Sequence, residues 1–311
     1  MEKDSKIYIS GHKGMVGSAI KRKLEAEGYL NLVLRSHSEL DLTRQKATEN
    51  FFMKEKPQYV FNAAARVGGI HENEAYPADF IYENLQIQNN IINSACMSGV
   101  NKLMFIGSNC IYPKECPQPM REEYLWTGRL EPTNRAFAAA KLAGVEMCSA
   151  YNIQHGRDFI SVIPASLFGP NDDYDEINSH FVPALIRKVH EAKAKNKEQV
   201  MLWGTGNPRR ELMHVDDFAD AALFLMNNYY SADPINVGTG EDRSIKEIAG
   251  LVKKIVGFEG SIIFDRKNPD GMMQKLLDSE WINSLGWKAR TGIEEGLRKT
   301  YEWYVGNCKA L

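Results

Sequence analysis

The sequence predicts an α/β protein with a doubly wound parallel sheet, followed by a smaller α/β region. Short apolar strands alternate with helical patterns through residue 163, as in proteins whose parallel strands are joined by helices. The first strand, over residues 6–10, leads directly into a turn with three glycines. A helical pattern follows that turn at once. This order favours a doubly wound sheet with its functional site at the carboxyl ends of the strands.

Composition limits the classes of protein that the chain can belong to. With 311 residues it is longer than a typical single core, which predicts one large domain or two fused ones. Hydrophobic residues make up 43% and charged residues 25% of the chain, as in an ordinary soluble globular protein. A formal net charge of -2 excludes a global basic field that would recruit nucleic acid or an acidic membrane. We expect a first domain over residues 1–165 and a second over 166–311, with some exchange of strands and helices.

The ends and the cysteines of the chain predict its compartment. Residues 1–6 enter the first strand without the long apolar segment of a signal peptide, and no later run is long enough to cross a bilayer. We therefore expect a cytoplasmic protein. The cysteines are odd in number and lack C-x-x-C spacing, so neither a disulfide framework nor a metal site is expected. They are Cys96, Cys110, Cys116, Cys148 and Cys308.

Three glycines after the first strand have the spacing G-x-x-G-x-x-G. Such glycines allow a tight turn, close approach of the backbone to a pyrophosphate, and close packing of the helix on the strand. The amino terminus of the following helix, expected over residues 18–27, then faces the anion. The motif therefore predicts a dinucleotide-binding loop. Its residues are Gly11, Gly14, Met15, Val16 and Gly17.

The second strand, over residues 31–34, ends at Arg35 and Ser36. An acidic residue at this position would bind the ribose 2'-hydroxyl of NAD, whereas an arginine beside a small hydroxyl residue suits the 2'-phosphate of NADP. The alternative is a solvated arginine at a strand end, and we favour NADPH. After the third strand, over 59–62, the small residues Ala63, Ala64 and Ala65 would let a cofactor lie against the backbone.

Ser108, Phe137 and Lys141 are the next candidates for a site. Helices are expected over residues 45–55 and 77–98, and the strand over 102–106 ends just before Ser108. Phe137 and Lys141 are four residues apart in an alanine-rich run that favours helix, so both project from one helical face toward Ser108. Taken alone, this spacing favours the alternative that they fill a core face and a solvated face.

These residues resemble the Ser/Tyr/Lys site of the extended short-chain dehydrogenase/reductase superfamily, with phenylalanine in place of the tyrosine. A longer series of motifs, in the same order, resembles the GDP-L-fucose synthase family over essentially the whole chain. The motifs are residues 110–114, 117–120, 130–134, 178–180, 203–204, 214–217, 236–240 and 275–278.

The resemblance implies a Rossmann-type NADP(H)-binding domain over residues 1–165 and a GDP-sugar-binding domain over 166–311. It implies NADPH-dependent reduction of the C4 ketone of a GDP-4-keto-6-deoxy sugar, with epimerisation at carbons 3 and 5. It also implies a homodimer, in which the helix over 77–98 and the helix bearing Lys141 pack against the same helices of a second copy.

The resemblance also implies roles for individual residues. Cys110 and His180 are the acid/base pair for proton transfer at carbons 3 and 5. Ser108 holds the carbonyl oxygen on which charge develops, and Lys141 holds the nicotinamide ribose. The other implied contacts are Asp41 and Leu42 near the adenine, with Arg187, Trp203, Arg210 and Lys275 near the GDP-sugar.

Two departures from the family pattern concern the sugar. Ser166 stands where the family commonly has asparagine. Met272, Met273 and Gln274 stand where it commonly has threonine, proline and arginine. These changes leave open whether the sugar is a hexose or, as in a related bacterial branch that makes capsular polysaccharide, a heptose.

The third departure is Phe137, which keeps the aromatic ring and loses the acid. Losing a positioned general acid costs about 100- to 10,000-fold in rate. Because Ser108, Cys110, Lys141 and His180 are retained, we hypothesise that the chain is a Tyr-to-Phe variant of an active enzyme, with low activity. Two alternatives stay open: a GDP-sugar epimerase without effective reduction, and a non-catalytic NADP(H)-binding sensor.

Overall fold

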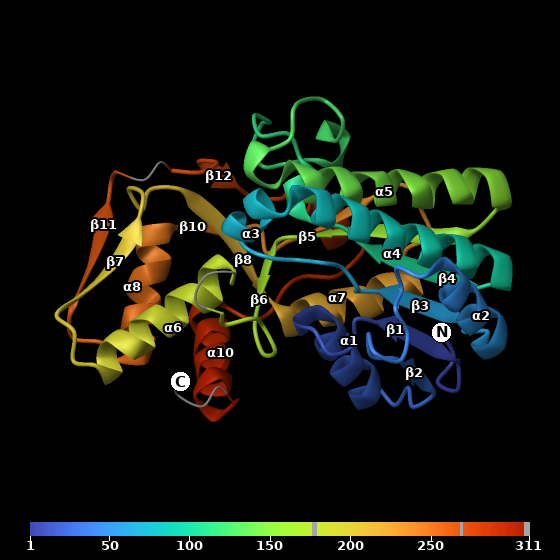
Figure 1. Cartoon of the computed structure of the whole chain (residues 1–311), viewed down its shortest axis with the longest axis horizontal. Helices are drawn as coiled ribbons and strands as arrows, with labels where there is room; N and C mark the ends of the chain where they lie inside the picture. Colours follow the sequence, from blue (N-terminus) through green and yellow to red (C-terminus); the bar gives the residue numbers. More distant parts are fainter. Residues whose placement is uncertain (176–178, 268–269, 308–311) are drawn as a thin grey trace.

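The computed structural model describes residues 1–175, 179–267 and 270–307, which form two halves (Figure 1). Asn178 and Cys308, named above, lie outside the described residues. The larger half contains a six-stranded sheet in the order β2-β1-β3-β4-β5-β9, with every neighbouring pair parallel. Its strands are β1 (Ile7–Ser10), β2 (Leu32–Leu34), β3 (Tyr59–Asn62), β4 (Lys102–Ile106), β5 (Asp158–Pro164) and β9 (Ile235–Val237).

Helices cover both faces of this sheet, which confirms the doubly wound architecture. α4 and α5 pack together on one face, with α2 against α4, whereas α1 and α7 pack together on the other (Figure 1). The strands between them are almost fully buried, so the core of this half is the sheet itself. The helices are α1 (Met15–Ala26), α2 (Gln45–Glu55), α3 (Ile70–Ala75), α4 (Pro77–Ser98), α5 (Arg135–His155) and α7 (Val215–Asn228).

The expected helices over 45–55 and 77–98 are confirmed at both ends. The expectation that the first helix starts at residue 18 is wrong, because α1 begins at Met15. Gly14 is its N-cap, with an extended backbone at φ -75° and ψ 170°. The helix therefore begins inside the glycine motif, and Met15 and Val16 form its first turn rather than part of a loop.

The smaller half is built around β8 (Arg209–His214). β10 pairs with β8 in the antiparallel direction, and β6 and β12 pair with it in the parallel direction. A separate parallel pair, β7 with β11, lies at the far end of this half (Figure 1). The remaining strands are β6 (Ser166–Phe168), β7 (Gln199–Trp203), β10 (Asp242–Ser244), β11 (Ser261–Asp265) and β12 (Gln274–Lys275).

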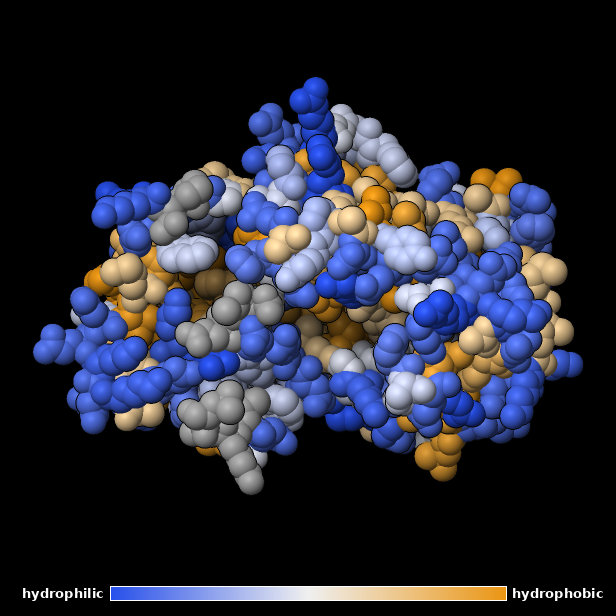
Figure 2. All heavy atoms as spheres, viewed as in Figure 1, coloured by the Kyte–Doolittle hydropathy of each residue, from blue (hydrophilic) through white to orange (hydrophobic). Residues whose placement is uncertain are grey.

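Three helices complete the apolar core of the smaller half, with α8 packed against both of the others. They are α6 (Phe181–Ala194), α8 (Ile245–Val256) and α10 (Ile293–Asn307). The short helix α9 (Glu280–Ser284) lies against β9 instead. On the face in Figure 2, hydrophilic side chains cover most of the surface, and hydrophobic ones show in the hollow between the halves.

The two halves exchange elements. β9 and α7 follow the first strands of the smaller half in sequence, yet β9 adds to the large sheet beside β5, and α7 packs on α1. Among the described residues, no helix combines the length and hydrophobicity needed to cross a membrane.

A long loop of the larger half reaches across to residues 276–278, which follow β12. It comprises residues 113–134 and contains the short helical turns η2 (Glu122–Tyr124) and η3 (Pro132–Asn134). Backbone hydrogen bonds run from Met120 N to Leu276 O at 2.7 Å and from Asp278 N to Met120 O at 2.8 Å. Leu276 N also donates to Oε1 of Gln118 at 2.9 Å. The chain just after Cys110 is thus attached to the chain just after Lys275.

A buried carboxylate ties β8 to the same strand end. Glu211 is 1% exposed, and its Oε1 accepts hydrogen bonds from the backbone N of Thr239 at 2.6 Å and of Gly240 at 2.9 Å. Its Oε2 accepts one from Leu277 N at 2.8 Å. Burial raises the pKa of Glu211, and these hydrogen bonds oppose that shift. One side chain therefore satisfies three backbone donors from two segments.

We predict that Glu211→Leu lowers the free energy of unfolding by on the order of 3 kcal/mol, because it leaves three backbone N–H groups without an acceptor in the interior. The midpoint of urea unfolding measures the effect. Glu241→Leu is the matched control, since Glu241 is exposed, and should change stability by less than about 0.5 kcal/mol. Equal effects of the two substitutions would contradict the assigned role of Glu211.

Candidate active site

The glycine turn, Ala63 to Ala65 and Ser108 follow three neighbouring strands of the large sheet, β1, β3 and β4, at their carboxyl ends. Parallel strands bring these ends to one edge, where doubly wound sheets bind their ligands. Gly11 has φ +69°, and a Cβ there would lie 2.9 Å from both Ala63 O and Ala64 N. A Cβ on Gly17 would lie 2.2 Å from Gly11 O. The turn is therefore built for close approach of backbone to backbone, as a pyrophosphate cradle requires.

Arg35 and Ser36 lie at the same edge, directly after β2. Nη2 of Arg35 pairs with Glu55 at 2.8 Å, and its Nη1 donates to the carbonyl of Leu34 at 2.7 Å. The backbone N and the Oγ of Ser36 both donate to Oε2 of Glu39, at 2.7 and 2.6 Å. Two donors of Ser36 thus converge on one anionic oxygen of Glu39, and the preceding residue, Arg35, carries a guanidinium. These donors fit a phosphate.

Asp41 and Leu42 are held by different partners. Asp41 accepts hydrogen bonds from N and Oγ1 of Thr43 at 3.0 and 2.6 Å, and the hydroxyl bond is the main reason that its pKa is lowered. Leu42 is buried, and its carbonyl accepts from Nδ2 of Asn90 on α4 at 2.8 Å. This segment is therefore fixed against the helix layer beside the cofactor edge.

Ser108 and Cys110 occupy a short 3-10 turn, η1 (Asn109–Ile111), that follows β4. Ser108 is its N-cap, and the serine Oγ accepts a hydrogen bond from Cys110 N at 3.2 Å. The Sγ of Cys110 lies 3.8 Å from Oδ1 of Asn109 and 3.7 Å from Nζ of Lys275. A hydroxyl and a thiol are thus presented two residues apart at the start of one short turn.

Lys141 and Phe137 both lie on α5 but in different surroundings. Lys141 is 5% exposed, and its Nζ donates to the carbonyl of Ile106 at 2.9 Å and lies 4.8 Å from the ring centre of Phe105. Burial lowers the pKa of Lys141 to about 8, so it is still mostly protonated at pH 7. An ammonium has three donors, and among the described residues the one to Ile106 is the hydrogen bond that Lys141 makes.

Phe137 is half-buried and packs edge to face on Phe80, with ring centres 6.4 Å apart and planes at 80°. The ring of Phe80 lies in turn under the guanidinium of Arg66, whose Cζ is 5.1 Å from the ring centre. The ring of Phe137 therefore fills an aromatic contact and offers no proton.

The smaller half brings Arg210 and Lys275 together. They are register partners on β8 and β12, so their side chains project from the same face. Burial lowers the pKa of the Arg210 guanidinium, and the charges of Cys110 and Asp270 oppose this shift. Arg210 also borders a cavity of about 160 Å³ with two further arginines, Arg243 and Arg290. Sequence reasoning did not identify these two as site residues, because a single arginine in a loop or strand carries no spacing signal.

Arg187, Trp203 and His180 lie in other surroundings. Arg187 pairs with Glu191 at 2.7 Å and donates to the carbonyl of Tyr174 at 2.8 Å. Trp203 is 76% exposed at the end of β7. His180 is the N-cap of α6 and is an exposed residue, and desolvation by the surrounding protein lowers the pKa of its imidazole.

Two further residues of the site carry no signal in the sequence. Nδ2 of Asn109 donates to the Oγ of Ser166 at 3.2 Å, which links the Cys110 turn to one of the unusual positions. Asp270 accepts hydrogen bonds from N and Oγ1 of Thr205 at 2.8 and 2.6 Å and holds the turn after β7. Both contacts join segments far apart in the chain, which explains why spacing did not reveal them.

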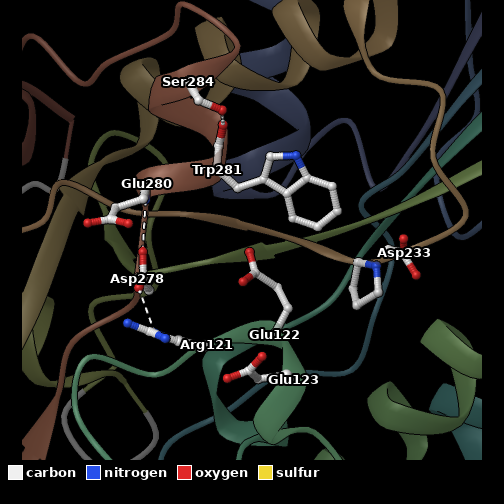
Figure 3. A pocket seen from close by; sticks show the side chains of 9 residues that line it. Arg121, Glu122, Glu123, Asp233, Asp278, Glu280, Trp281 and Ser284 are labelled. Carbon is white, nitrogen blue, oxygen red and sulfur yellow. Dashed lines mark hydrogen bonds and ion pairs between the residues drawn. The ribbon is translucent and has the colours of Figure 1, made fainter.

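A second cavity, of about 680 Å³, contains none of the predicted site residues. Pro234, directly before β9, borders it, so it lies toward the amino end of that strand, away from the carboxyl edge. Figure 3 shows acidic side chains around the indole of Trp281, with Arg121 paired to Asp278. Its lining is Arg121, Glu122, Glu123, Asp233, Pro234, Asp278, Glu280, Trp281 and Ser284.

Comparison with known proteins agrees with this architecture. Residues 7–238 match the family described as NAD dependent epimerase/dehydratase. The chain is 55% identical to a putative GDP-L-fucose synthase 2 of Arabidopsis thaliana, over 99% of this chain and 94% of the relative. It is 48% identical to the GDP-L-fucose synthase of Escherichia coli strain K12, over 97% of each.

A solved structure agrees as well. The GDP-mannoheptose C4 reductase of Campylobacter jejuni, with NADP bound, is 42% identical and superposes with a TM-score of 0.89, over 98% of this chain and 99% of that one. The family match covers residues 7–238, and the identity to both relatives extends over nearly the whole chain. The chain therefore belongs to the NAD dependent epimerase/dehydratase family and, within it, to the GDP-L-fucose synthase family.

Proposed function

We propose that the chain is a GDP-sugar reductase that acts on the C4 ketone of a GDP-4-keto-6-deoxy-hexose or a GDP-4-keto-heptose, with epimerisation at neighbouring carbons. The observation that carries this proposal is the convergence of Ser108 and Cys110 on one turn beside the buried Lys141. The relatives support the substrate class, since two are named GDP-L-fucose synthase and one is a GDP-mannoheptose C4 reductase. Such enzymes serve GDP-L-fucose or capsular heptose biosynthesis, and we expect this one to work in the cytoplasm.

The cofactor in this proposal is NADPH, which supplies the hydride when it is bound. The glycine turn, with its close backbone contacts, would hold the pyrophosphate. Arg35 and Ser36 would hold the 2'-phosphate, because their donors already converge on anionic oxygens. Residues 1–165, completed by α7 and β9, would form the cofactor domain, and the rest would form the GDP-sugar domain.

The residues of the chain would divide the chemistry between them. The hydroxyl of Ser108 can hydrogen-bond the ketone oxygen and stabilise the charge that develops there. The Lys141 ammonium has three donors and gives one to Ile106, so it can also bind the ribose hydroxyls. Cys110 and His180 would remove and return protons next to the ketone, because the carbonyl acidifies them. Phe137 would stand where the reduction needs an acid.

A second candidate function follows from Phe137. Proton exchange by Cys110 and His180 does not need a phenol, whereas protonation of the reduced oxygen does. In this alternative the chain epimerises a GDP-sugar without effective reduction. The two candidates differ in whether NADPH is consumed. The non-catalytic sensor is less favoured, because a sensor has no evident need for an acid/base pair such as Cys110 and His180.

We predict that Phe137→Tyr raises the rate of NADPH oxidation by about 100- to 10,000-fold, because it adds a general acid beside the Lys141 ammonium. The loss of reduced-nicotinamide absorbance is followed with GDP-4-keto-6-deoxymannose and a GDP-4-keto-heptose in parallel, and the faster sugar identifies the substrate. Phe224→Tyr, which adds a hydroxyl to a half-buried ring of α7, is the control and should leave the rate unchanged. If neither sugar is reduced faster by Phe137→Tyr, the reductase proposal fails.

We also propose a homodimer that forms through α4 and α5. The two helices pack side by side and carry large exposed apolar side chains, among them Tyr82 at 63%, Met97 at 73% and Ile153 at 81%. A second copy would bury this surface as a four-helix bundle. Light scattering should give a mass of about twice 35.2 kDa, and Ile153→Glu should shift it toward that of one chain. A native mass of one chain at micromolar concentration would exclude the dimer.

A further inference from the structure

Lys275 belongs to the smaller half, but its Nζ lies 3.7 Å from the Sγ of Cys110 in the larger half. Within the described ranges it has no ion pair with a carboxylate, although 2.6–3.9 Å pairs of this kind hold many other lysines and arginines of the chain. An ammonium that approaches a thiol and no carboxylate is arranged to meet negative charge on sulfur.

The backbone of Lys275 is fixed from both sides. Just before it, Arg209 N donates to Met273 O at 2.7 Å, and β12 then pairs with β8 in the register Lys275 to Arg210. Just after it, Leu276 N donates to Gln118 Oε1 at 2.9 Å, and Leu277 N donates to Glu211 Oε2 at 2.8 Å. Lys275 is therefore not a mobile surface lysine, because the backbone that carries it has no freedom to turn away.

The same hydrogen bonds fix Lys275 relative to Cys110. Gln118 and Met120 follow Cys110 by eight and ten residues, and both bond to the strand end that follows Lys275. The turn that carries the thiol and the strand that carries the ammonium are thus attached to each other directly. Arg210 adds a second cation on the same face, and its charge interacts with Cys110.

We propose that Lys275 is a positioning residue whose ammonium stabilises the thiolate of Cys110 for proton transfer. This inference rests on the proposed function, in which Cys110 serves as the base. The thiolate takes a proton from the carbon next to the ketone, so an S–H bond forms as the C–H bond breaks. The electron pair of that bond moves to the ketone oxygen as an enolate, and Lys275 keeps its proton throughout.

This role differs from binding the sugar nucleotide, which the family resemblance implies for Lys275. A phosphate ligand would change the affinity for GDP when it is removed. A thiolate partner would change the nucleophilicity of Cys110 in the free protein, with no ligand present. The two roles are therefore separable without any measurement of turnover.

The experiment measures alkylation of Cys110 by iodoacetamide at pH 7, with the modified peptide quantified by mass spectrometry. Only the thiolate reacts, so Lys275→Met should slow the alkylation by about tenfold. Lys275→Arg keeps the positive charge and should stay within about threefold of the native rate. Lys188→Met removes an exposed lysine of α6 and should change nothing. Cys110→Ser assigns the peptide signal.

Isothermal titration with GDP separates the outcomes. Slow alkylation with Lys275→Met and unchanged alkylation with Lys188→Met supports the proposal. Native alkylation with Lys275→Met, together with weaker GDP binding, shows a phosphate ligand and overturns it. If the proposed function itself is wrong, the result differs: the native chain binds no GDP, while the alkylation rates still differ between the variants.

Discussion

The candidate active site depends on two contacts that hold residues 276–278, which follow β12. One is made by the buried carboxylate of Glu211, and the other by the loop over residues 113–134. Glu211 accepts the backbone N–H groups of Thr239, Gly240 and Leu277, and the loop over residues 113–134 bonds to the same strand end through Gln118 and Met120. A buried charge costs free energy unless its hydrogen bonds are made, so Glu211 keeps its partners in place. Without this arrangement the smaller half could not hold Lys275 and Arg210 at the carboxyl edge of the large sheet.

The site has two chemical parts with different fates in this chain. The proposed proton-transfer part consists of Cys110, which lies on a short turn with a cation 3.7 Å from its sulfur, and His180 at the start of α6. The reduction part has Ser108 and a buried Lys141 but no phenol at position 137, where a ring packs on Phe80 instead. In our proposal the chain therefore exchanges protons on the sugar more often than it transfers hydride. A tyrosine at position 137 would couple the two steps again.

The sequence was sufficient for features that depend on local order. The helices over 45–55 and 77–98 were predicted at both ends, and the glycine turn was placed after the first strand, because periodicity and glycine spacing are local. The start of α1 was missed, because an extended glycine at position 14 can cap a helix as readily as continue a loop. The contact between Cys110 and Lys275 joins residues 165 positions apart, and no pattern within a strand or helix predicts it. The same holds for Asn109 with Ser166 and for Asp270 with Thr205.

In our proposal proton exchange and reduction are separate capacities of one site, and Phe137 weakens only the reduction. The direct measurement is incubation of the native chain with NADPH and a GDP-4-keto sugar in deuterium oxide, with deuterium in the sugar and oxidised NADPH quantified in the same sample. For the native chain we expect more deuterium at the carbons next to the ketone than NADPH consumed. For Phe137→Tyr we expect about one deuterium at each exchanged carbon for every NADPH oxidised. Absence of deuterium in both proteins, or equal ratios in the two, would contradict it.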